Sequence, residues 1–289
     1  MGHATFRAGD LTVVIGDNAA DGQHRAGYNG VWSLTHRDEA DNFFVPTVAG
    51  LNLEHIINGE DFDHDGTSRV FFEPRNAPMT FTRLSDTEAE LHQPPTPTFH
   101  LESWTHFTLV APHYVDLHFR CQARQHVFRF GTIAVFWASY INAPDDKSIY
   151  FRRSQTWQQL CTQQHNDEST VRHPGDRVTL RFVDGYPPAL YRNLSPLYYD
   201  EPFYYGNFKG MVAILMFDRT SGIRFTHSPS GGGGNTERQT SNPAWDFQFL
   251  IPGYEVNREY GFRAGLAYRP RCNRAEIRQE VAAWRRGLG

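Results

Sequence analysis

The segment that decides the fold runs from Glu90 to Cys121 and reads ELHQPPTPTFHLESWTHFTLVAPHYVDLHFRC. Apolar and polar residues alternate over its final positions, as in a strand with one face in a core and the other toward solvent. The polar face of this strand would carry Tyr114, Asp116, His118 and Arg120. A strand that only had to pack would use plainer polar residues, so the segment predicts a β-sheet with a functional surface.

The composition of the whole chain agrees with a β-rich fold. Its 289 residues include 22 Phe, 13 Tyr and 6 Trp, which favour strands, and 24 Gly and 17 Pro, which supply turns. A chain of this length can bury one large core. The net charge of −4 gives no general attraction to nucleic acid or acidic membranes, and no segment approaches the ~20 apolar residues of a membrane span. We therefore expect neither nucleic acid nor a membrane as a partner.

The N-terminal stretch and the cysteines indicate a compartment. The opening residues MGHATFRAGDLTVVIGD contain no apolar run long enough for a signal peptide, so we expect a cytoplasmic protein. Cys121, Cys161 and Cys272 are odd in number and far apart, which predicts buried free thiols rather than disulfides or a thiolate zinc site. A homodimer is the default expectation for such a chain.

Strand signals follow one another along the chain with little helix between them. Strands are expected at residues 11–15, 30–34, 79–83, 87–91, 101–110, 114–122, 132–139, 148–152, 177–183, 211–218, 222–226, 245–251 and 260–268. One helix is predicted over residues 273–286, with a capping box from Asn273 to Glu276 and an apolar face. No linker divides the chain. The pattern predicts one all-β domain over residues 1–289, a large two-sheet antiparallel sandwich (a supersandwich) with a short C-terminal helix.

The central strands contain the first candidate site. His92, Glu102 and His106 lie on neighbouring predicted strands, with Trp104 between the last two. Glu102 and His106 fall on the same face, so an acid and an imidazole would be presented beside an aromatic ring. Histidine suits proton transfer near neutral pH. These residues therefore predict general acid–base chemistry on a sheet surface; the alternative is that single members are core or rim histidines.

Two later segments contribute further candidates. Residues 136–151, FWASYINAPDDKSIYF, carry Trp137, Tyr140 and Lys147 around a turn, a mixture suited to stacking a sugar ring while binding its hydroxyls or a carboxylate. The glycines at 231–234 predict a flexible lid, with plain disorder as the alternative. His227 precedes this stretch and Asp246 follows it, so we expect the two to approach each other across a groove, with Gln248 on the same strand face as Asp246.

An acidic stretch provides the one candidate metal site. Residues 61–69, DFDHDGTSR, place Asp61, Asp63 and Asp65 at the spacing that begins a calcium loop. The end of the loop does not match, because the twelfth position is Phe72 and the glutamate, Glu73, comes one place late. A solvated acidic turn is the alternative. We expect no cofactor apart from a structural calcium ion if this loop binds metal.

Several parts of the chain resemble the galactose-mutarotase-like β-supersandwich group of carbohydrate-active proteins. They are GVWSL at 30–34, the paired central strands with their histidines, and FQFLIPGYEVNREYGFRAGLAY at 247–268. The resemblance implies that fold, a sugar ligand, histidines that protonate the ring oxygen and a late carboxylate that acts as base. By position, His92 or His106 would resemble the former and Asp246 the latter.

The chain also departs from the mutarotase pattern. Where mutarotases have His-x-Tyr-Phe-Asn-Leu, residues 136–144 read FWASYINAP and contain no histidine. The segments EPRNAPM, ELHQPPTPT and NPAWDFQF suggest a family without a settled function within the group. The resemblance therefore supports the fold more directly than the reaction.

The leading hypothesis is a carbohydrate-active enzyme that uses general acid–base catalysis on a sugar or oligosaccharide. His92, His227 and Asp246 would transfer protons, and Glu102 would orient them or act as a second acid. The residues expected to bind substrate are Trp104, Arg120, Trp137, Tyr140, Lys147, Gln248 and Arg263.

Four alternatives stay open. A β-eliminating lyase on uronic-acid polymers would neutralise the substrate carboxylate with Lys147, Arg120 or Arg263. A glycosidase would need two carboxylates about 5 to 9 Å apart across a groove, for which Glu102 and Asp246 are candidates. A metal-dependent sandwich enzyme is the third. A non-catalytic carbohydrate-binding protein is favoured if these histidines and acids point to different surfaces.

Overall fold

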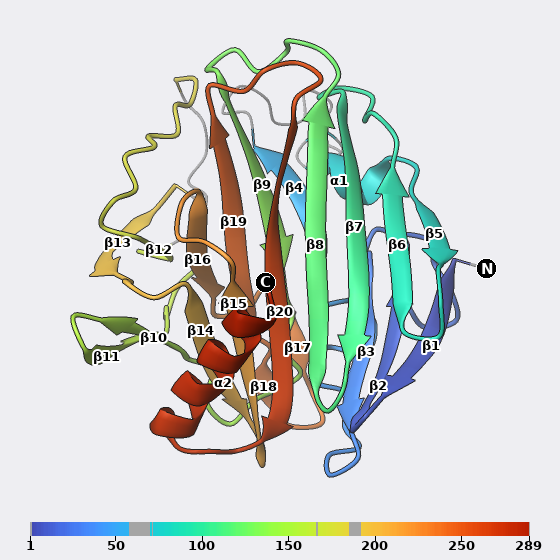
Figure 1. The fold of residues 1–289 in the computed structure, drawn as a ribbon, viewed down its shortest axis with the longest axis vertical. Helices are drawn as coiled ribbons and strands as arrows, with labels where there is room; N and C mark the ends of the chain where they lie inside the picture. Colours follow the sequence, from blue (N-terminus) through green and yellow to red (C-terminus); the bar gives the residue numbers. More distant parts are fainter. Residues whose placement is uncertain (1, 58–69, 71, 166, 185–191, 289) are drawn as a thin grey trace.

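Two large β-sheets pack face to face in the computed structural model, which describes residues 2–57, 70, 72–165, 167–184 and 192–288 (Figure 1). The first sheet has nine antiparallel strands. In spatial order they are β11 (Thr156–Leu160), β10 (Ile149–Arg153), β14 (Phe203–Phe208), β15 (Met211–Phe217), β20 (Glu259–Pro270), β8 (Tyr114–Ala123), β7 (Leu101–Val110), β6 (Glu88–Gln93) and β5 (Thr80–Arg83).

The second sheet has six strands and lies behind the first in Figure 1. In spatial order they are β13 (Leu194–Tyr198), β12 (Thr170–Arg172), β16 (Ile223–Ser228), β19 (Ala244–Pro252), β9 (Thr132–Ala138) and β4 (Asn52–Ile57). The β12–β13 pair is parallel and the other pairs are antiparallel. The predicted antiparallel sandwich is confirmed, with this one parallel exception.

Two small sheets and two helices complete the described chain. The small sheets are β1 (His3–Ala8), β2 (Leu11–Gly16) and β3 (Gly30–His36), and the hairpin β17 (Gly234–Asn235) with β18 (Thr240–Ser241). The helices are α1 (Glu73–Asn76) and α2 (Arg274–Gly287). Within the described residues, no helix is long and apolar enough to cross a membrane. All three cysteines are free; we expected them to be buried, which holds for Cys121 but not for the half-buried Cys161 and Cys272.

The core lies between the two large sheets, where alternate residues of facing strands meet. Phe247 on β19 is fully buried and stacks on Trp137 of β9, with ring centroids 5.7 Å apart. Phe119 on β8, from the other sheet, packs edge-on against the same indole at 5.0 Å. The alternation that predicted strands in the sequence therefore reflects one row of side chains directed into this aromatic core.

Helix α2 covers part of the outer face of the nine-stranded sheet, in front of β15 and β20 in Figure 1. The predicted capping box is confirmed: the Asn273 side chain accepts from the backbone N–H of Glu276, and the Glu276 carboxylate accepts from the backbone N–H of Asn273. Ile277, Val281 and Trp284 form the buried face. The uncovered half of the sheet exposes the outer faces of β6, β7 and β8.

One predicted strand is wrong. Residues 177–183 have no strand pairing, although Val178, Leu180 and Phe182 alternate with more exposed residues. These three side chains pack on an apolar cluster at the outer face of the six-stranded sheet. Their alternation follows from one-sided burial of an extended, irregular segment, and alternation alone does not require a ladder of backbone hydrogen bonds.

Candidate functional site

The side chains singled out in the sequence lie on two different sheets. The first group stands on the outer face of the nine-stranded sheet and comprises His92, Glu102, Trp104, His106, Arg120 and Arg263. The second belongs to the six-stranded sheet and adjoining segments and comprises Trp137, Tyr140, Lys147, His227, Asp246 and Gln248. The expected convergence of all of them on one cavity is wrong, because the sandwich core separates the two groups.

In the first group the side chains are held by one another. His92 Nε2 lies 2.8 Å from Glu102 Oε1, and Arg124 also pairs with Glu102. Trp104 stacks on His92 with ring centroids 5.2 Å apart, and the Arg120 guanidinium lies 5.4 Å from the indole centroid. The strand register places His92 and Arg120 on opposite sides of Trp104. Both faces of the indole are covered, so Trp104 offers no open platform to a sugar ring.

The remaining members of this group lie nearer to α2. His106 on β7 is directly opposite His118 on β8, and Arg263 on β20 is opposite His118 on its other side. His106 Nε2 is 3.9 Å from the Glu88 carboxylate. This row of side chains is polar and open to solvent. It lies on the outer face of the nine-stranded sheet, whereas the inner face packs against the six-stranded sheet that contains Asp246.

His227 has a structural role. Its Nδ1 accepts from the Thr162 hydroxyl and its Nε2 donates to the Lys147 carbonyl, each at 2.8 Å, and the residue is fully buried. Burial lowers its pKa to about 4. His227 pairs with Trp245, so the next residue, Asp246, points to the opposite face of the sheet. The expectation that His227 approaches Asp246 across a groove is therefore wrong.

Two of the expected binding residues, Trp137 and Gln248, are buried in the fold, whereas Lys147 is half-exposed. Trp137 is fully buried within the sandwich core, where it cannot contact a ligand, so that expectation is corrected. Lys147 Nζ donates to Ser241 Oγ at 2.9 Å. Gln248 is buried and donates to the hydroxyls of neighbouring threonines. Of the second group, Tyr140 and Asp246 remain as candidates for chemistry.

Tyr140 and Asp246 belong to a set of ionisable side chains on the outer face of the six-stranded sheet. We call it the acid cluster; its members are Glu54, His55, Arg75, Tyr140 and Asp246. Tyr140 donates to Glu54 Oε1 at 2.5 Å, Arg75 Nη1 donates to the same oxygen at 3.1 Å, and His55 Nε2 lies 3.5 Å from Glu54 Oε2. Glu54 is 4% exposed. A buried carboxylate with three partners is thus the centre of the cluster.

A β-bulge directs Glu54 into the cluster. On β4, Leu53 pairs with Trp137 and His55 pairs with Phe136. The two partners are consecutive on β9, so Glu54 is an extra residue on β4 without a partner in the ladder. A bulge locally bends a strand and redirects a side chain, and bulges are common next to active sites. The regular alternation of the strand would have placed Glu54 and the following His55 on opposite faces. The bulge allows both side chains to meet.

Helix α1 fixes the position of Arg75. The Asn18 amide donates to the carbonyl of Ala77 at 2.7 Å and to that of Arg75 at 3.1 Å, which satisfies acceptors at the end of the helix. The Arg75 guanidinium donates to the Gly27 carbonyl and lies 3.9 Å from the centroid of the Tyr28 ring. Arg75 is therefore held as a fixed cation against Glu54.

The two carboxyl groups of the cluster differ in their electrostatics. Burial raises the pKa of Asp246 well above the usual range, and the negative charge of Glu54 raises it further, whereas a hydrogen bond from Ser139 N–H at 3.0 Å opposes the shift. Burial also acts to raise the pKa of Glu54, but His55, Arg75 and Tyr140 outweigh it and leave that pKa below its ordinary value. Opposite displacements of this kind are the pattern expected of a proton donor and a proton acceptor.

The Gly-rich segment lies against Tyr140. A Cβ atom on Gly232 would stand 3.2 Å from Tyr140 Cβ and 2.9 Å from Asn242 Cβ, and one on Gly231 would stand 3.4 Å from the Tyr140 ring. Only residues without side chains allow the segment to pack this closely. The stretch predicted as a flexible lid is thus a close-fitting cover over one side of the tyrosine.

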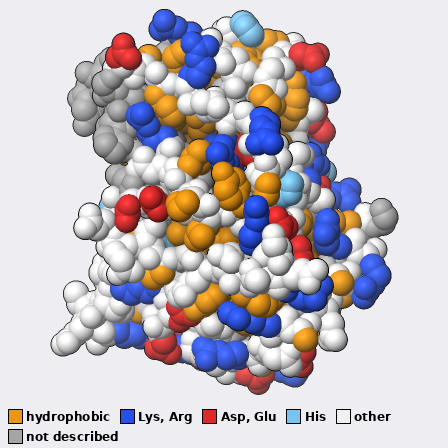
Figure 2. Space-filling view, turned by 90° about the vertical axis from the view of Figure 1, so that its left-hand side faces the viewer, with side chains coloured by type: hydrophobic (Ala, Val, Ile, Leu, Met, Phe, Trp, Pro, Cys, Tyr) orange, Lys and Arg blue, Asp and Glu red, His pale blue; other side chains and the backbone are white. Residues whose placement is uncertain are grey.

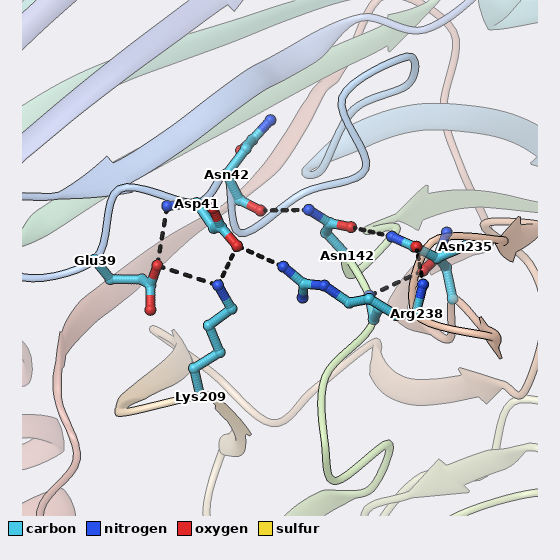
Figure 3. A network of polar contacts seen from close by, with 9 residues as sticks. Glu39, Asp41, Asn42, Asn142, Lys209, Asn235 and Arg238 are labelled. Atoms are coloured by element: carbon cyan, nitrogen blue, oxygen red, sulfur yellow. Dashed lines mark hydrogen bonds and ion pairs between the residues drawn. The ribbon is translucent and has the colours of Figure 1, made fainter.

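A polar network fastens the hairpin that follows this stretch (Figure 3). Lys209 and Arg238 both donate to the Asp41 carboxylate. Asn142 donates to the Asn42 carbonyl and accepts from Asn235, each at 3.1 Å. Segments near residues 40, 142, 209 and 236 are thereby joined, and the cover over Tyr140 is held by several hydrogen bonds.

Sequence reasoning missed Glu54, His55 and Arg75. The signal for the first two was present: Asn52–Ile57, NLEHII, buries an acid and an imidazole within an otherwise apolar strand, which is rare unless they are paired. Asp61, Asp63 and Asp65 lie outside the described residues. Among the residues that are described, no three His, Cys, Asp or Glu side chains are close enough to hold a metal ion.

Comparison with known proteins identifies the fold. No family model matches the chain, and no curated protein matches it in sequence. A candidate aldose 1-epimerase from Escherichia coli K12 matches in structure with a TM-score of 0.52 at 10% identity, over 93% of this chain and 99% of that chain. The chain has a galactose-mutarotase-like fold.

Two other structures match with TM-scores below 0.5. A galactose mutarotase-like protein from Lactobacillus casei ATCC 334 gives 0.49 at 8% identity, over 92% of this chain and all of that one. The heparan sulfate lyase HepC from Pedobacter heparinus gives 0.47 at 12% identity, over 94% of this chain and 36% of the lyase. At these identities the galactose-mutarotase-like fold defines the architecture, and the site rests on the side chains themselves.

Proposed function

We propose that the outer face of the six-stranded sheet binds a reducing sugar and interconverts its anomers, with Asp246 as proton donor and Glu54 as proton acceptor. The observation that carries this proposal is the pair of buried carboxyl groups whose pKa values are displaced in opposite directions beside Tyr140. The sequence alone favoured Asp246 as the base. Its raised pKa supports the acid role instead.

The reaction needs one proton delivered and one removed. Asp246 would protonate the ring oxygen while Glu54 takes the proton from the hydroxyl on C1, so that the bond between C1 and the ring oxygen breaks and an open-chain carbonyl forms. Rotation about the C1–C2 bond exposes the other face of the carbonyl. Ring closure with the proton transfers reversed then gives the other anomer and restores both carboxyl groups.

Tyr140 and Arg75 would act on Glu54 as positioning residues. The phenol and the guanidinium share Oε1, which leaves Oε2 on the side of His55. Contacts of this kind in a buried site fix the geometry before a ligand binds. Because Glu54, Tyr140 and Asp246 are only 4%, 7% and 2% exposed, a sugar can reach them only if the segments that cover them move.

A non-catalytic sugar-binding role is the second candidate. The low exposure of the acid cluster favours a role without catalysis, because buried carboxyl groups can hold the neighbouring loops in place without touching a substrate. Both candidates predict that a ligand raises the melting temperature. A sugar present at a hundred times its Kd would stabilise the protein by about 2.7 kcal/mol, which is roughly 5 °C for a chain of this size.

The test is to measure anomer exchange by magnetisation-transfer NMR on a panel of aldoses and uronates, using the wild type and E54Q. We expect the wild type to accelerate exchange of at least one sugar that also raises its melting temperature, and E54Q to lose about 100-fold or more of that acceleration. The matched control is E102Q, which removes a carboxylate that is also paired with a histidine and an arginine, on the other sheet.

The outcomes separate the candidates. E102Q should retain the wild-type rate within twofold. Equal loss in E54Q and E102Q, or full activity in E54Q, would refute the acid–base assignment. A sugar that stabilises the wild type without any acceleration of anomer exchange would establish the binding role instead.

A further inference from the structure

We propose a second ligand site: three adjoining hollows beside the end of β19 and across β20 and β8 form one groove that binds an acidic oligosaccharide. This inference does not rest on the acid cluster. Along β19 the groove reaches Leu250, which shares a strand face with Asp246 but lies four residues away, about 13 Å in an extended strand.

The first hollow has a volume of 540 Å³ and lies between three segments of chain. It is bordered by residues 173–178, by 219–222 between β15 and β16, and by Phe249–Pro252 at the end of β19. Figure 2 shows the side of the molecule that carries residues 173–183, where basic side chains are interspersed with apolar ones. A hollow of this size suits one ligand unit, since small-molecule pockets span about 300 to 1,000 Å³.

The three hollows are continuous because they share lining residues. Arg219 and Tyr260 line both the first hollow and a second of 160 Å³. His118 and Arg263 line both the second and a third of 250 Å³, which extends to Trp284 on α2. Together the three hollows lead from the edge of the sandwich onto the outer face of the nine-stranded sheet.

The acidic side chains in the groove already have partners. Asp218 forms two hydrogen bonds with Arg219, at 3.0 and 2.9 Å, and Glu259 lies 3.3 Å from Arg120. Asp176 pairs at 2.6 Å with Arg224, with both side chains buried. Asp116 accepts a hydrogen bond from the Trp284 indole of α2 at 2.8 Å. The arginines offset the charges of Asp218, Glu259 and Asp176 from within the protein, whereas the indole is neutral and Asp116 is influenced electrostatically by Arg263.

Two arginines remain available to a ligand. Arg177 in the first hollow and Arg263 at the junction of the other two are both exposed, and neither forms an ion pair with any residue that the structure describes. His118 stands beside Arg263. Guanidinium groups bind carboxylates and sulfates through paired hydrogen bonds, so two separated arginines predict two separated anionic groups on one ligand.

The groove is better suited to a sparsely charged sugar chain than to a nucleic acid. Thr220 and Ser221 line the first hollow together with Arg177, and Tyr260 lines both this hollow and the one that contains Arg263. Their hydroxyls and the tyrosine ring can contact uncharged hydroxyl groups and a ring face of a sugar. Two arginines without an ion-pair partner among the described residues cannot balance a polymer with a phosphate on every unit. The chain as a whole is negative, at −4, so the two arginines are a local feature.

The experiment is isothermal titration calorimetry with a hyaluronan tetrasaccharide, in which two uronate units alternate with two neutral units, and, as the neutral probe, chitotetraose. We expect the wild type to bind the acidic tetrasaccharide and not the neutral one, with affinity falling as salt rises. The double variant R177Q/R263Q should weaken binding by tenfold or more, as expected for the loss of charge-assisted contacts. The matched control is R7Q, which removes an exposed arginine on β1, outside the groove.

Several results would overturn the proposal. They are equal affinity for the acidic and neutral probes, no binding of the acidic probe to the wild type, equal weakening in R7Q and the double variant, and equally tight binding of a single-stranded tetranucleotide. E54Q should bind the hyaluronan tetrasaccharide as the wild type does, so failure of the groove and failure of the acid–base proposal are distinguishable. Circular dichroism melting of each variant confirms that the exposed substitutions leave the fold intact.

Discussion

The hydrogen bond between Tyr140 and Glu54 gives the sharpest prediction. The phenol donates to a carboxylate oxygen at 2.5 Å, and both residues are buried. A hydrogen bond to a charged, buried group contributes about 1.5 to 3 kcal/mol. We therefore expect Y140F to reduce the free energy of unfolding by that amount, which lowers the melting temperature by about 3 to 6 °C. The pKa of Glu54 should rise, because a contact that stabilises its ionised form is lost.

Urea unfolding followed by tryptophan fluorescence measures this change, with Y150F as the matched control. Tyr150 also donates to a carboxylate, that of Asp146 at 2.9 Å, but at a more exposed position. Its loss should cost less stability and leave sugar-induced stabilisation unchanged. A loss in Y140F below about 0.5 kcal/mol, the usual scatter of surface substitutions, would show that the bond to Glu54 does not hold the site together.

Three further predictions follow from burial and packing. Since burial lowers the pKa of His227 to about 4, the wild type should lose stability as pH falls from about 6.5 toward 4, and H227Q should show a weaker dependence in urea titrations over that range. Since the pKa of Asp246 is raised in the folded state, the unfolded state loses the proton of this carboxyl group first, and the free energy of unfolding falls as pH rises above about 4. D246N should remove this dependence, which amounts to at most about 1.4 kcal/mol per pH unit. G232A should displace the cover from Tyr140 and weaken sugar-induced stabilisation, whereas G234A, whose Cβ would meet nothing within 4 Å, should not.

Strands with one buried face were predictable from the sequence. Leu101–Val110 alternates between buried and half-exposed residues, and the predicted limits match those observed. Phe203–Phe208 was missed because nearly all of its residues are buried, so FYYGNF shows no alternation. Fully buried strands lack the period-two pattern, and residues 177–183 have the pattern without being a strand.

The candidate site was predicted only in part, for a topological reason. The sequence correctly placed His92 and Glu102 on neighbouring strands, and the pairing of these strands brings the two side chains within 2.8 Å of each other. The spacing of residues in the sequence does not indicate which sheet a strand joins. Because β19 belongs to the six-stranded sheet, Asp246 lies on the far side of the core from His92 and Glu102. Glu54 could have been suspected as an acid within an apolar run, but its meeting with Tyr140 depends on a bulge and on strand pairing across 86 positions.

The split between the two buried carboxyl groups is the central claim, and carboxyl-labelled ¹³C NMR tests it directly. Spectra recorded between pH 4 and 8 for the wild type, with D246N and E54Q used for assignment, report the charge of each group. The account predicts that Glu54 titrates below the usual glutamate range and that Asp246 remains protonated well above the usual aspartate range, with its pKa falling in E54Q. If both groups are ionised at pH 5 in the wild type, the acid–base pair does not exist.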